Sequence, residues 1–425
     1  MDTPDFDVII VGAGIAGSSC ALLCARAGLS VLLLERATQP GAKNMSGGRL
    51  YSYALENLIP DFASQAPVER QVTQEKISLL SGKSATTFDY LHPPFSPATT
   101  SWTILRARFD PWLMEQARHA GAECMTQSQV EDLFVENGVV RGVVVEGETL
   151  LAGTVVLAEG ANTLLAERYG LLPKPAEHHV AIGVKEVLAL PQDVLENRFS
   201  LEENEGAAWL FSGDINGALP AGGFLYTNKE TISLGIVCPL SALRAGNTPL
   251  PQMMENFRQH PRLKSLLKNS ELLEYGAHLV PEGGMSSIPR NLAGPGWLVI
   301  GDSARFCVNT GLTIRGMDLA ILSAQAAAQT LSTHSEGSLR DAYHQQLQAS
   351  DLWSVLKRYQ HLPEMLLHTH ALYSKYPQML AELQREHYET GFSSPEHLIK
   401  RVLKHARRQG FISVMQDLLR GVKSL

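Results

Sequence analysis

The chain is 425 residues long, carries a formal net charge of −7 at pH 7, and contains 44% hydrophobic and 19% charged residues. These fractions are those of an ordinary globular protein, and the length allows two or three domains around a large core. We expect no transmembrane helix, because no run of about 18 or more uncharged apolar residues occurs. The acidic balance argues against a nucleic-acid-binding protein.

A strand, turn, helix, strand unit is predicted over residues 8–35. Its β-branched first run leads directly into a glycine-rich turn, and an apolar helical pattern then leads to a second apolar run that ends in an acidic residue. This spacing is typical of a dinucleotide-binding βαβ unit. The residues predicted to bind the cofactor here are Gly12, Ala13, Gly14, Ile15, Ala16, Gly17, Glu35 and Arg36.

Each of these positions has a physical reason. Gly12 permits the tight turn, Gly14 lets backbone N–H groups approach a pyrophosphate, and Gly17 lets the helix lie close to the sheet. The helix N-terminus adds unpaired N–H groups and a partial positive charge. Glu35 is placed to accept hydrogen bonds from both hydroxyls of an adenosine ribose. A free 2′-hydroxyl is therefore expected, as in FAD or NAD.

A second motif lies far along the chain, where a buried strand ends in Gly301 and Asp302 and a long alanine-rich helix runs from about 317 to 331. We predict that Asp302 binds ribityl hydroxyls. A helix is predicted to begin near Gly311, so that its N-terminus at Leu312 and Thr313 directs N–H groups at the flavin N1 and C2 carbonyl. Only FAD is long enough to need both motifs, so the second one decides the cofactor.

Between these motifs the chain alternates between helical and strand-like segments. The polar loop after Glu35 is predicted to pass near the flavin and to lead into a helical stretch. Asp110 is predicted as the N-cap of a helix that Gly121 stops, and Asn137-Gly138 as a hairpin turn. Residues from about 176 to 280 predict a largely antiparallel sheet, crossed by a helix over 251–269.

Metal and membrane sites receive little support from the sequence. The five scattered cysteines do not predict an iron–sulfur cluster or a structural zinc site, and His368 and His370 would not share a helix face.

Residues 397–425 carry a net charge of +6, which leaves −13 for the rest. An amphipathic helix over 398–419 is predicted to pack on the body or to meet a membrane or partner. A strand starting at Val8 leaves no room for a leader peptide, so we expect a cytoplasmic protein, with attachment to the inner membrane face open.

With these motifs in view, the sequence resembles the electron-transfer-flavoprotein:quinone oxidoreductase superfamily, and within it the shorter FixC-type flavoproteins. The segments that carry the resemblance are Gly12-Ala13-Gly14, Gly41-Ala42-Lys43-Asn44, Ser46-Gly47-Gly48-Arg49-Leu50-Tyr51, Arg106 with Phe109-Asp110, Gly222-Gly223-Phe224-Leu225-Tyr226-Thr227, Gly301-Asp302 and Thr313-Ile314-Arg315-Gly316-Met317-Asp318. They extend over almost the whole chain.

The resemblance implies an α/β fold with a glutathione-reductase-type FAD-binding Rossmann domain, an inserted antiparallel-sheet substrate or quinone domain, and a helical C-terminal region. The ranges expected are 1–75, 103–175 and 281–335 for the FAD domain, 76–102 and 176–280 for the substrate domain, and 336–425 for the helical region. It also implies that Arg106 contacts the FAD diphosphate side, that Val130 contacts adenine through its backbone, and that Asp302 contacts the ribityl or pyrophosphate.

Two positions depart from related flavoproteins. Related hydroxylases carry Asp-Gly followed by Arg, whereas Glu159-Gly160 and Ala166 stand here; Gly160 and Gly48 complete the predicted FAD contacts. Arg305 follows the second motif where relatives have a small residue, and we expect it to add positive charge close to the flavin.

The leading functional hypothesis is an FAD-dependent oxidoreductase in an electron-transfer chain. By resemblance its partners are electron-transfer-flavoprotein subunits and a separate ferredoxin-like protein, with quinone or a membrane surface as further candidates. The alternative is a flavin hydroxylase or isoprenoid-type reductase that acts on a small apolar substrate and is reduced by NAD(P)H. A third reading is a flavin-dependent scaffold without activity of its own. No residue is singled out for proton transfer.

Overall fold

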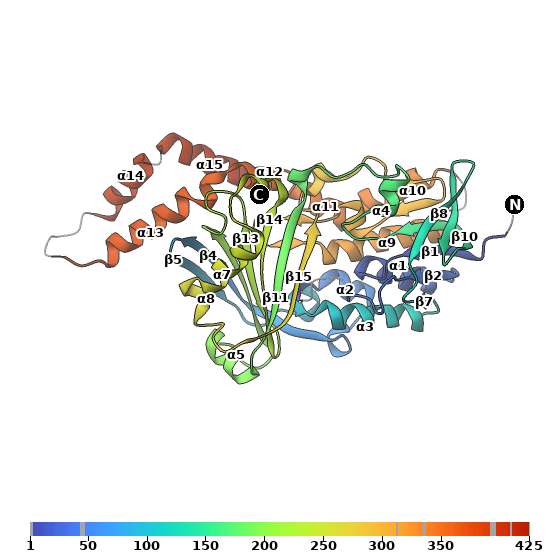
Figure 1. Ribbon diagram of the computed structural model, residues 1–425, viewed down its shortest axis with the longest axis horizontal. Helices are drawn as coiled ribbons and strands as arrows, with labels where there is room; N and C mark the ends of the chain where they lie inside the picture. Colours follow the sequence, from blue (N-terminus) through green and yellow to red (C-terminus); the bar gives the residue numbers. More distant parts are fainter. Residues whose placement is uncertain are drawn as a thin grey trace.

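The computed structural model describes residues 3–42, 47–311, 313–334, 337–391, 397–408 and 410–424. Two sheets lie along the long axis of the molecule, one near the N-terminus and one in the middle, and the last helices, α13 to α15, extend from the opposite end (Figure 1). The predicted α/β architecture, with mixed sheets and a helical C-terminal region, is confirmed.

The first sheet forms around the N-terminal βαβ unit. Its order is β16 (Ala293–Gly294), β17 (Trp297–Val299), β10 (Glu148–Leu157), β1 (Phe6–Val11), β2 (Val31–Leu34) and β7 (Glu123–Met125). From β17 to β7 the neighbours are parallel. Continuous apolar runs suit such strands because both faces are covered. On one side α1 (Ile15–Arg26) packs against α3 (Arg106–His119) and α9 (Met317–Thr333).

A hairpin extends β10 beyond this sheet. It consists of β8 (Val130–Glu136) and β9 (Val139–Val145), and β9 pairs with the start of β10. Asn137 and Gly138 have φ angles of 51° and 78°, so the predicted hairpin turn at this pair is confirmed.

The second sheet is largely antiparallel, as predicted for residues 176–280. Its order is β15 (Glu271–Val280), β11 (Ala181–Ala189), β14 (Thr231–Pro239), β13 (Gly222–Thr227), β12 (Glu205–Gly213), β4 (Val68–Ser81), β6 (Ser101–Ile104) and β3 (Gly48–Tyr51), with β5 (Ser84–Leu91) paired to β4. The pair of β12 and β4 is parallel. The strands β3 and β4 thus belong to the second sheet, although the ranges expected from the sequence place residues up to 75 in the FAD domain. The division into domains stays a prediction.

Helices cover one face of the second sheet. The helices α5 (Gln192–Phe199), α7 (Leu250–Gln259) and α8 (Pro261–Lys264) contribute apolar side chains to one core cluster with Trp209 of β12. The single helix predicted over 251–269 is wrong, because His260, with ψ of 134°, interrupts it before Pro261. The other face of the sheet borders a cavity that it shares with the N-terminal βαβ unit.

Two further helix boundaries differ from the sequence prediction. The helix α3 begins at Arg106, so Asp110 lies inside it and is not its N-cap. The reason is an ion pair between Arg106 and Asp110, one turn apart, that buries the carboxylate within the helix. Gly121, with φ of 107°, follows the helix end as predicted.

The C-terminal region is helical, as predicted. It contains α10 (Leu339–Ala349), α11 (Asp351–Arg358), α12 (Leu362–His368), α13 (Lys375–Tyr388), α14 (Leu398–Arg408) and α15 (Phe411–Ser424). The single amphipathic helix expected over 398–419 is wrong, since Gly410 has a φ of 87° and separates α14 from α15. Within the described residues, none of the helices combines the length and the apolar character that crossing a bilayer requires.

The remaining helices are short connections. They are α2 (Tyr53–Leu58), α4 (Leu164–Arg168) and α6 (Leu240–Ala245). The stretch expected to be helical after the polar loop begins instead with the strand β3 and then continues into α2.

Candidate functional site

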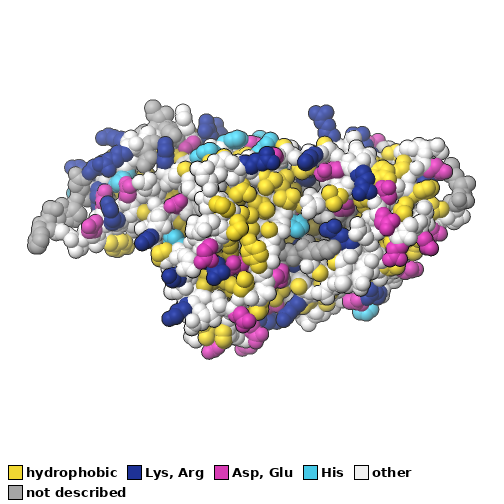
Figure 2. Space-filling view, viewed as in Figure 1, with side chains coloured by type: hydrophobic (Ala, Val, Ile, Leu, Met, Phe, Trp, Pro, Cys, Tyr) yellow, Lys and Arg dark blue, Asp and Glu magenta, His cyan; other side chains and the backbone are white. Residues whose placement is uncertain are grey.

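One cavity of about 740 Å³ runs from the glycine-rich turn of the first sheet to the open face of the second. Its walls come from the ends of β1, β2 and β10, from the second sheet, from the segment after β17, and from α12. Figure 2 shows hydrophobic side chains gathered in the middle of the molecule, around β11 and β15, with charged side chains mostly to either side.

The glycines of the turn divide into two packed positions and one open position. A Cβ on Gly12 would lie 2.5 Å from the Ala158 carbonyl oxygen, and one on Gly17 would lie 1.9 Å from the Gly12 carbonyl oxygen. These two glycines therefore permit the close contact of strand and helix. A Cβ on Gly14 would find its nearest neighbour, Arg106 Nη2, at 3.8 Å, so the space above Gly14 is open.

The first turn of α1 borders this open space. Gly14 is its N-cap, and no described side chain caps the helix. The N–H groups of a first helical turn lack partners within the helix, and they carry the positive end of its dipole. An anionic group is the partner that suits this position.

The Glu35 carboxylate is held at the end of β2. Its Oε2 accepts from the Ala13 backbone N–H at 3.0 Å, and its Oε1 accepts from that of Ala37 at 2.9 Å. A carboxylate accepts about four hydrogen bonds, so each oxygen keeps capacity toward the cavity that Glu35 lines. Two hydroxyl groups on one ring match this arrangement.

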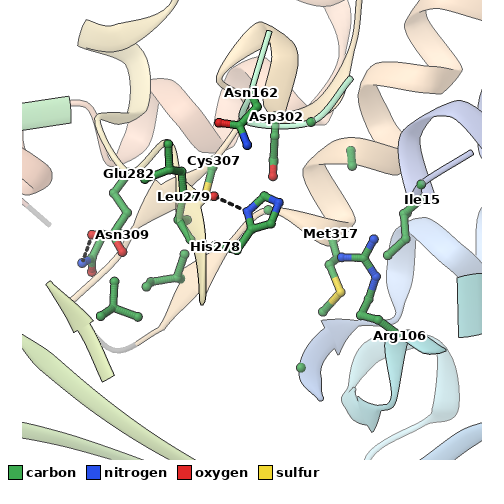
Figure 3. Close-up of a pocket in the computed structure, with 18 of the residues that line it drawn as sticks. Ile15, Arg106, Asn162, His278, Leu279, Glu282, Asp302, Cys307, Asn309 and Met317 are labelled. Carbon is green, nitrogen blue, oxygen red and sulfur yellow. Dashed lines mark hydrogen bonds between the residues drawn. The ribbon is translucent and has the colours of Figure 1, made fainter. Parts of the chain in front are cut away.

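Arg106 brings a fixed positive charge to the open space. Its Nε and Nη2 donate to the two carboxylate oxygens of Asp110, each at 2.6 Å, and Asp110 is fully buried. The planar pair fixes the guanidinium geometry more tightly than a single bond does. Burial raises the pKa of Asp302, while the charges of Arg106 and His278 oppose that rise. Arg106, His278 and Asp302 lie around the same part of the cavity (Figure 3), and their charges act on one another.

The second motif is built differently from the prediction. Asp302 follows β17 in a short turn and lines the cavity, but no helix begins at Gly311. Instead β18 (Val308–Asn309) pairs with β19 (Ile314–Arg315), and Gly311 has a φ of 74° in the turn between them. The side chain of Asn309 accepts from the Gly311 N–H at 2.9 Å and favours this turn over a helix.

The long helix α9 begins at Met317, as predicted for the alanine-rich helix, whereas the helix start predicted near Gly311 is wrong. Its N-terminus still faces the cavity, because Gly316 and Met317 line the wall. Leu312 lies outside the described residues.

Most of the residues predicted from the sequence meet in this one cavity. Those that line it are Gly12, Gly14, Ile15, Ala16, Glu35, Arg36, Gly48, Arg106, Val130, Gly160, Asp302, Gly311 and Thr313. Ala13 and Gly17 are buried beneath the turn. That the lining residues contact FAD stays a prediction.

The expected role of Arg305 is not supported. Its guanidinium donates to the backbone carbonyls of Ser287, at 2.9 Å, and of Pro173, and its side chain does not line the cavity. The carboxylate of Glu159 accepts from the backbone N–H groups of Leu165 and Ala166 and so caps the N-terminus of α4.

Several ionisable side chains of the cavity are absent from the sequence prediction, and two of them are Glu282 and Lys185. Glu282 accepts from Asn309 Nδ2 at 3.2 Å through Oε2, while Oε1 is buried without a partner among the described residues, and burial raises the pKa of Glu282 to about 7. Lys185 stands on β11, and its amine donates to the Gly47 carbonyl. A lysine inside the apolar run 181–189 is the signal that could have revealed it.

One wall of the cavity, formed by the second sheet and the segment around α12, carries several apolar side chains. They are Leu210, Phe224, Val237, Leu366, Leu367 and Tyr373. The cavity therefore joins an anion-binding end to an end suited to an uncharged ring.

Comparison with known proteins identifies the family. Residues 7–92 match the family described as FAD dependent oxidoreductase. The chain is 51% identical over 425 residues to the probable electron transfer flavoprotein-quinone oxidoreductase YgcN of Escherichia coli K12, and the alignment covers 99% of both chains. It is 44% identical over 427 residues to the protein FixC of the same strain, again over 99% of both. The chain belongs to the FixC family of FAD-dependent oxidoreductases.

Solved structures support the fold of this FixC-family chain. A geranylgeranyl bacteriochlorophyll reductase-like protein from Thermoplasma acidophilum superposes with a TM-score of 0.67 at 20% identity, covering 97% of this chain and 98% of that one. The flavin-dependent brominase Bmp2 gives a TM-score of 0.63 at 19% identity, covering 98% and 93%. At such identities the likeness concerns the fold alone.

The chemistry of the cavity suits the FAD of this family. The open space at Gly14 and the uncapped end of α1 match a diphosphate, and the two oxygens of Glu35 match a ribose diol. Thus the FixC-family chain has groups that suit the diphosphate and the adenosine ribose of the cofactor.

Proposed function

We propose that this FixC-family flavoprotein takes electrons from an electron transfer flavoprotein and passes them, through its FAD, to a quinone. The similarity over the full length to relatives that carry this description is the observation that supports the proposal most strongly. The apolar wall of the cavity supports it as well, because a quinone ring is flat and uncharged. When bound, FAD supplies the exchange of electrons, one or two at a time.

The protein residues bind and orient the cofactor in this proposal. The first turn of α1, with Gly12, Gly14 and Arg106, holds the diphosphate, while Glu35 accepts from the adenosine ribose. Val130 contacts adenine through its backbone, and Asp302 accepts from the ribityl chain. Gly48, Gly160 and the hairpin residues Gly311 and Thr313 complete the walls around the ring.

Partner binding is proposed for the basic C-terminal helices. Val402 and Leu403 of α14 are each 40% exposed, and Leu419 of α15 is 54% exposed, among lysines and arginines. An acidic electron carrier is the protein partner that suits such a surface. A separate ferredoxin-like protein belongs to the same proposal, as does a place at the inner face of the membrane, where quinones are dissolved.

The proposal is tested by steady-state turnover. Purified holoprotein is mixed with a reduced electron transfer flavoprotein and a short-chain quinone, and quinol formation is followed by absorbance. We expect quinol formation that requires both the holoprotein and the donor. Turnover with NADH or NADPH in place of the donor would instead support the hydroxylase or reductase alternative. No turnover with any donor would favour the inert scaffold.

A further inference from the structure

Lys185 is a partly buried lysine that lines the cavity from the second sheet. It stands in the middle of β11, paired with Gly235 of β14 and with Gly276 of β15. Side chains at paired positions point to the same face of a sheet, so the two glycines leave space beside the lysine. Phe224 of β13, which is paired with Gly235, fills one side, and its ring centroid lies 5.3 Å from Lys185 Nζ. The cavity face of the sheet is therefore flat and apolar at this point, apart from the amine of Lys185.

The amine is directed toward the part of the cavity where the ring of FAD is expected. It donates to the carbonyl of Gly47, and the adjacent Gly48 lies against α9, since a Cβ on Gly48 would be 3.0 Å from Met317 Cε. Gly48, Thr313 and Met317 at the start of α9 line the same cavity as Lys185. Lys185 therefore borders the part of the cavity that the Gly47-Gly48 segment forms.

The charges around Lys185 favour an anion in the cavity. Burial, followed by the positive charge of Arg106 on α3, lowers the pKa of Lys185 to about 7, and Glu274 on β15 opposes this. The two strands on the other side contribute Gly235 and Phe224, which carry no charge. Glu274 is the acidic group that favours the charged form of Lys185, while Asp110 forms the ion pair with Arg106.

We propose that Lys185 is the cation that faces the flavin ring and stabilises the negative charge which the ring gains on reduction. Bound FAD would supply a ring that takes up two electrons and one proton on reduction and so would carry one negative charge at its N1 and C2-carbonyl edge. Lys185, protonated from solvent, would supply the ammonium group that offsets this charge. Charge then balances within the cavity. This inference rests on FAD binding alone and does not require a particular donor or acceptor.

Sulfite is the probe for this charge, because its sulfur forms a bond to flavin N5 and the bonding pair leaves a negative charge on the same N1 edge. The holoprotein, Lys185→Met and Lys185→Arg are titrated with sulfite while the bleaching of the flavin is recorded. We expect Lys185→Met to bind sulfite at least about tenfold more weakly and Lys185→Arg to keep its affinity. Lys76→Met is the matched control, because Lys76 is a buried lysine of the same sheet that pairs with Asp89 and does not line the cavity.

The dependence on pH gives a second readout. Sulfite itself titrates near neutral pH, so the ratio of the affinity of the wild type to that of Lys185→Arg is the quantity compared. We expect this ratio to fall as pH rises between about 6 and 9, because only the lysine loses its proton in that range. A ratio that does not change with pH would contradict the proposal.

Two further outcomes would overturn the proposal. Wild-type sulfite affinity in Lys185→Met would show that the lysine does not face the ring. If Lys185→Met fails to fold, Lys185→Gln takes its place under the same criterion. Folded protein without FAD in both variants would place Lys185 at the diphosphate. If the wild-type holoprotein forms no quinol with a reduced electron transfer flavoprotein while Lys185→Met still binds sulfite more weakly than the wild type, the proposed function is contradicted and this inference stands.

Discussion

The two ends of the cavity are built in different ways. The diphosphate end comes mostly from one continuous segment, 8–35, in which the backbone itself makes the close contacts. The ring end combines residues that are far apart in the sequence, such as Gly48, Lys185 and Thr313. A local motif is thus sufficient for one half of the site, whereas the other half depends on the way in which two sheets meet.

Substitutions in the packed glycine turn of the diphosphate end should lower the free energy of unfolding strongly. In Gly17→Val, a Cβ would lie 1.9 Å from the Gly12 carbonyl oxygen, so α1 cannot keep its contact with the turn. We expect a loss of at least about 3 kcal/mol in the free energy of unfolding, measured by urea denaturation. Gly28→Ala is the control: Gly28 has a φ of 84° but open space around it, so the loss should be about 1 kcal/mol. Equal losses in the two variants would contradict the packing argument.

Gly14→Asp separates cofactor binding from folding. The space above Gly14 is open, so the side chain fits the protein, but its carboxylate occupies the position proposed for the diphosphate. We expect FAD affinity to fall at least about a hundredfold while the circular dichroism spectrum stays that of the wild type. FAD content is measured after gel filtration. Stoichiometric FAD in this variant would refute the proposed diphosphate position.

At the ring end, Glu282 predicts a dependence of stability on pH. Because burial raises the pKa of Glu282 to about 7, its contribution to stability is present below its unfolded pKa of about 4.3 and is lost as pH rises through 7. The loss should be on the order of 2 kcal/mol. Glu282→Gln should remove this dependence and unfold at a higher temperature than the wild type at pH 8. Parallel melting curves from pH 5 to pH 8 would show that the carboxyl group is not held neutral.

Tyr343→Phe should have the smallest effect. The buried hydroxyl of Tyr343 on α10 donates to the Val299 carbonyl of β17 at 3.0 Å and so supports the strand that presents Asp302. Its removal should lower the free energy of unfolding by about 1 kcal/mol with FAD content unchanged. A loss of FAD without a loss of stability would show that this contact positions the ring end and does not merely support it.

The same difference explains what could be predicted from the sequence. The βαβ unit, the hairpin at Asn137-Gly138 and the largely antiparallel sheet follow from patterns of a few adjacent residues, and they are confirmed. The helix start predicted near Gly311 and the single helix predicted across Gly410 are wrong, because an Asn side chain and a left-handed glycine each override a helical pattern. These are local competitions that average propensity does not resolve.

Lys185 and Glu282 could not be assigned to the site for a different reason. Neither residue is adjacent to a sequence motif. Lys185 lies on β11 and Glu282 follows β15, and both line the cavity because these strands lie opposite the N-terminal βαβ unit. Pairing with Gly235 and Gly276, which gives Lys185 its space, is a property of sheet register. Register depends on the whole sheet and not on the run that contains the lysine.

The most direct test of the account is a single-turnover experiment on the holoprotein without oxygen. The protein is mixed in a stopped-flow instrument with a reduced electron transfer flavoprotein, and separately with NADH and with NADPH, and flavin bleaching is recorded. We expect the reduced electron transfer flavoprotein to bleach the bound flavin rapidly and neither nucleotide to do so. Rapid bleaching by NADH or NADPH, with none by the flavoprotein, would contradict it.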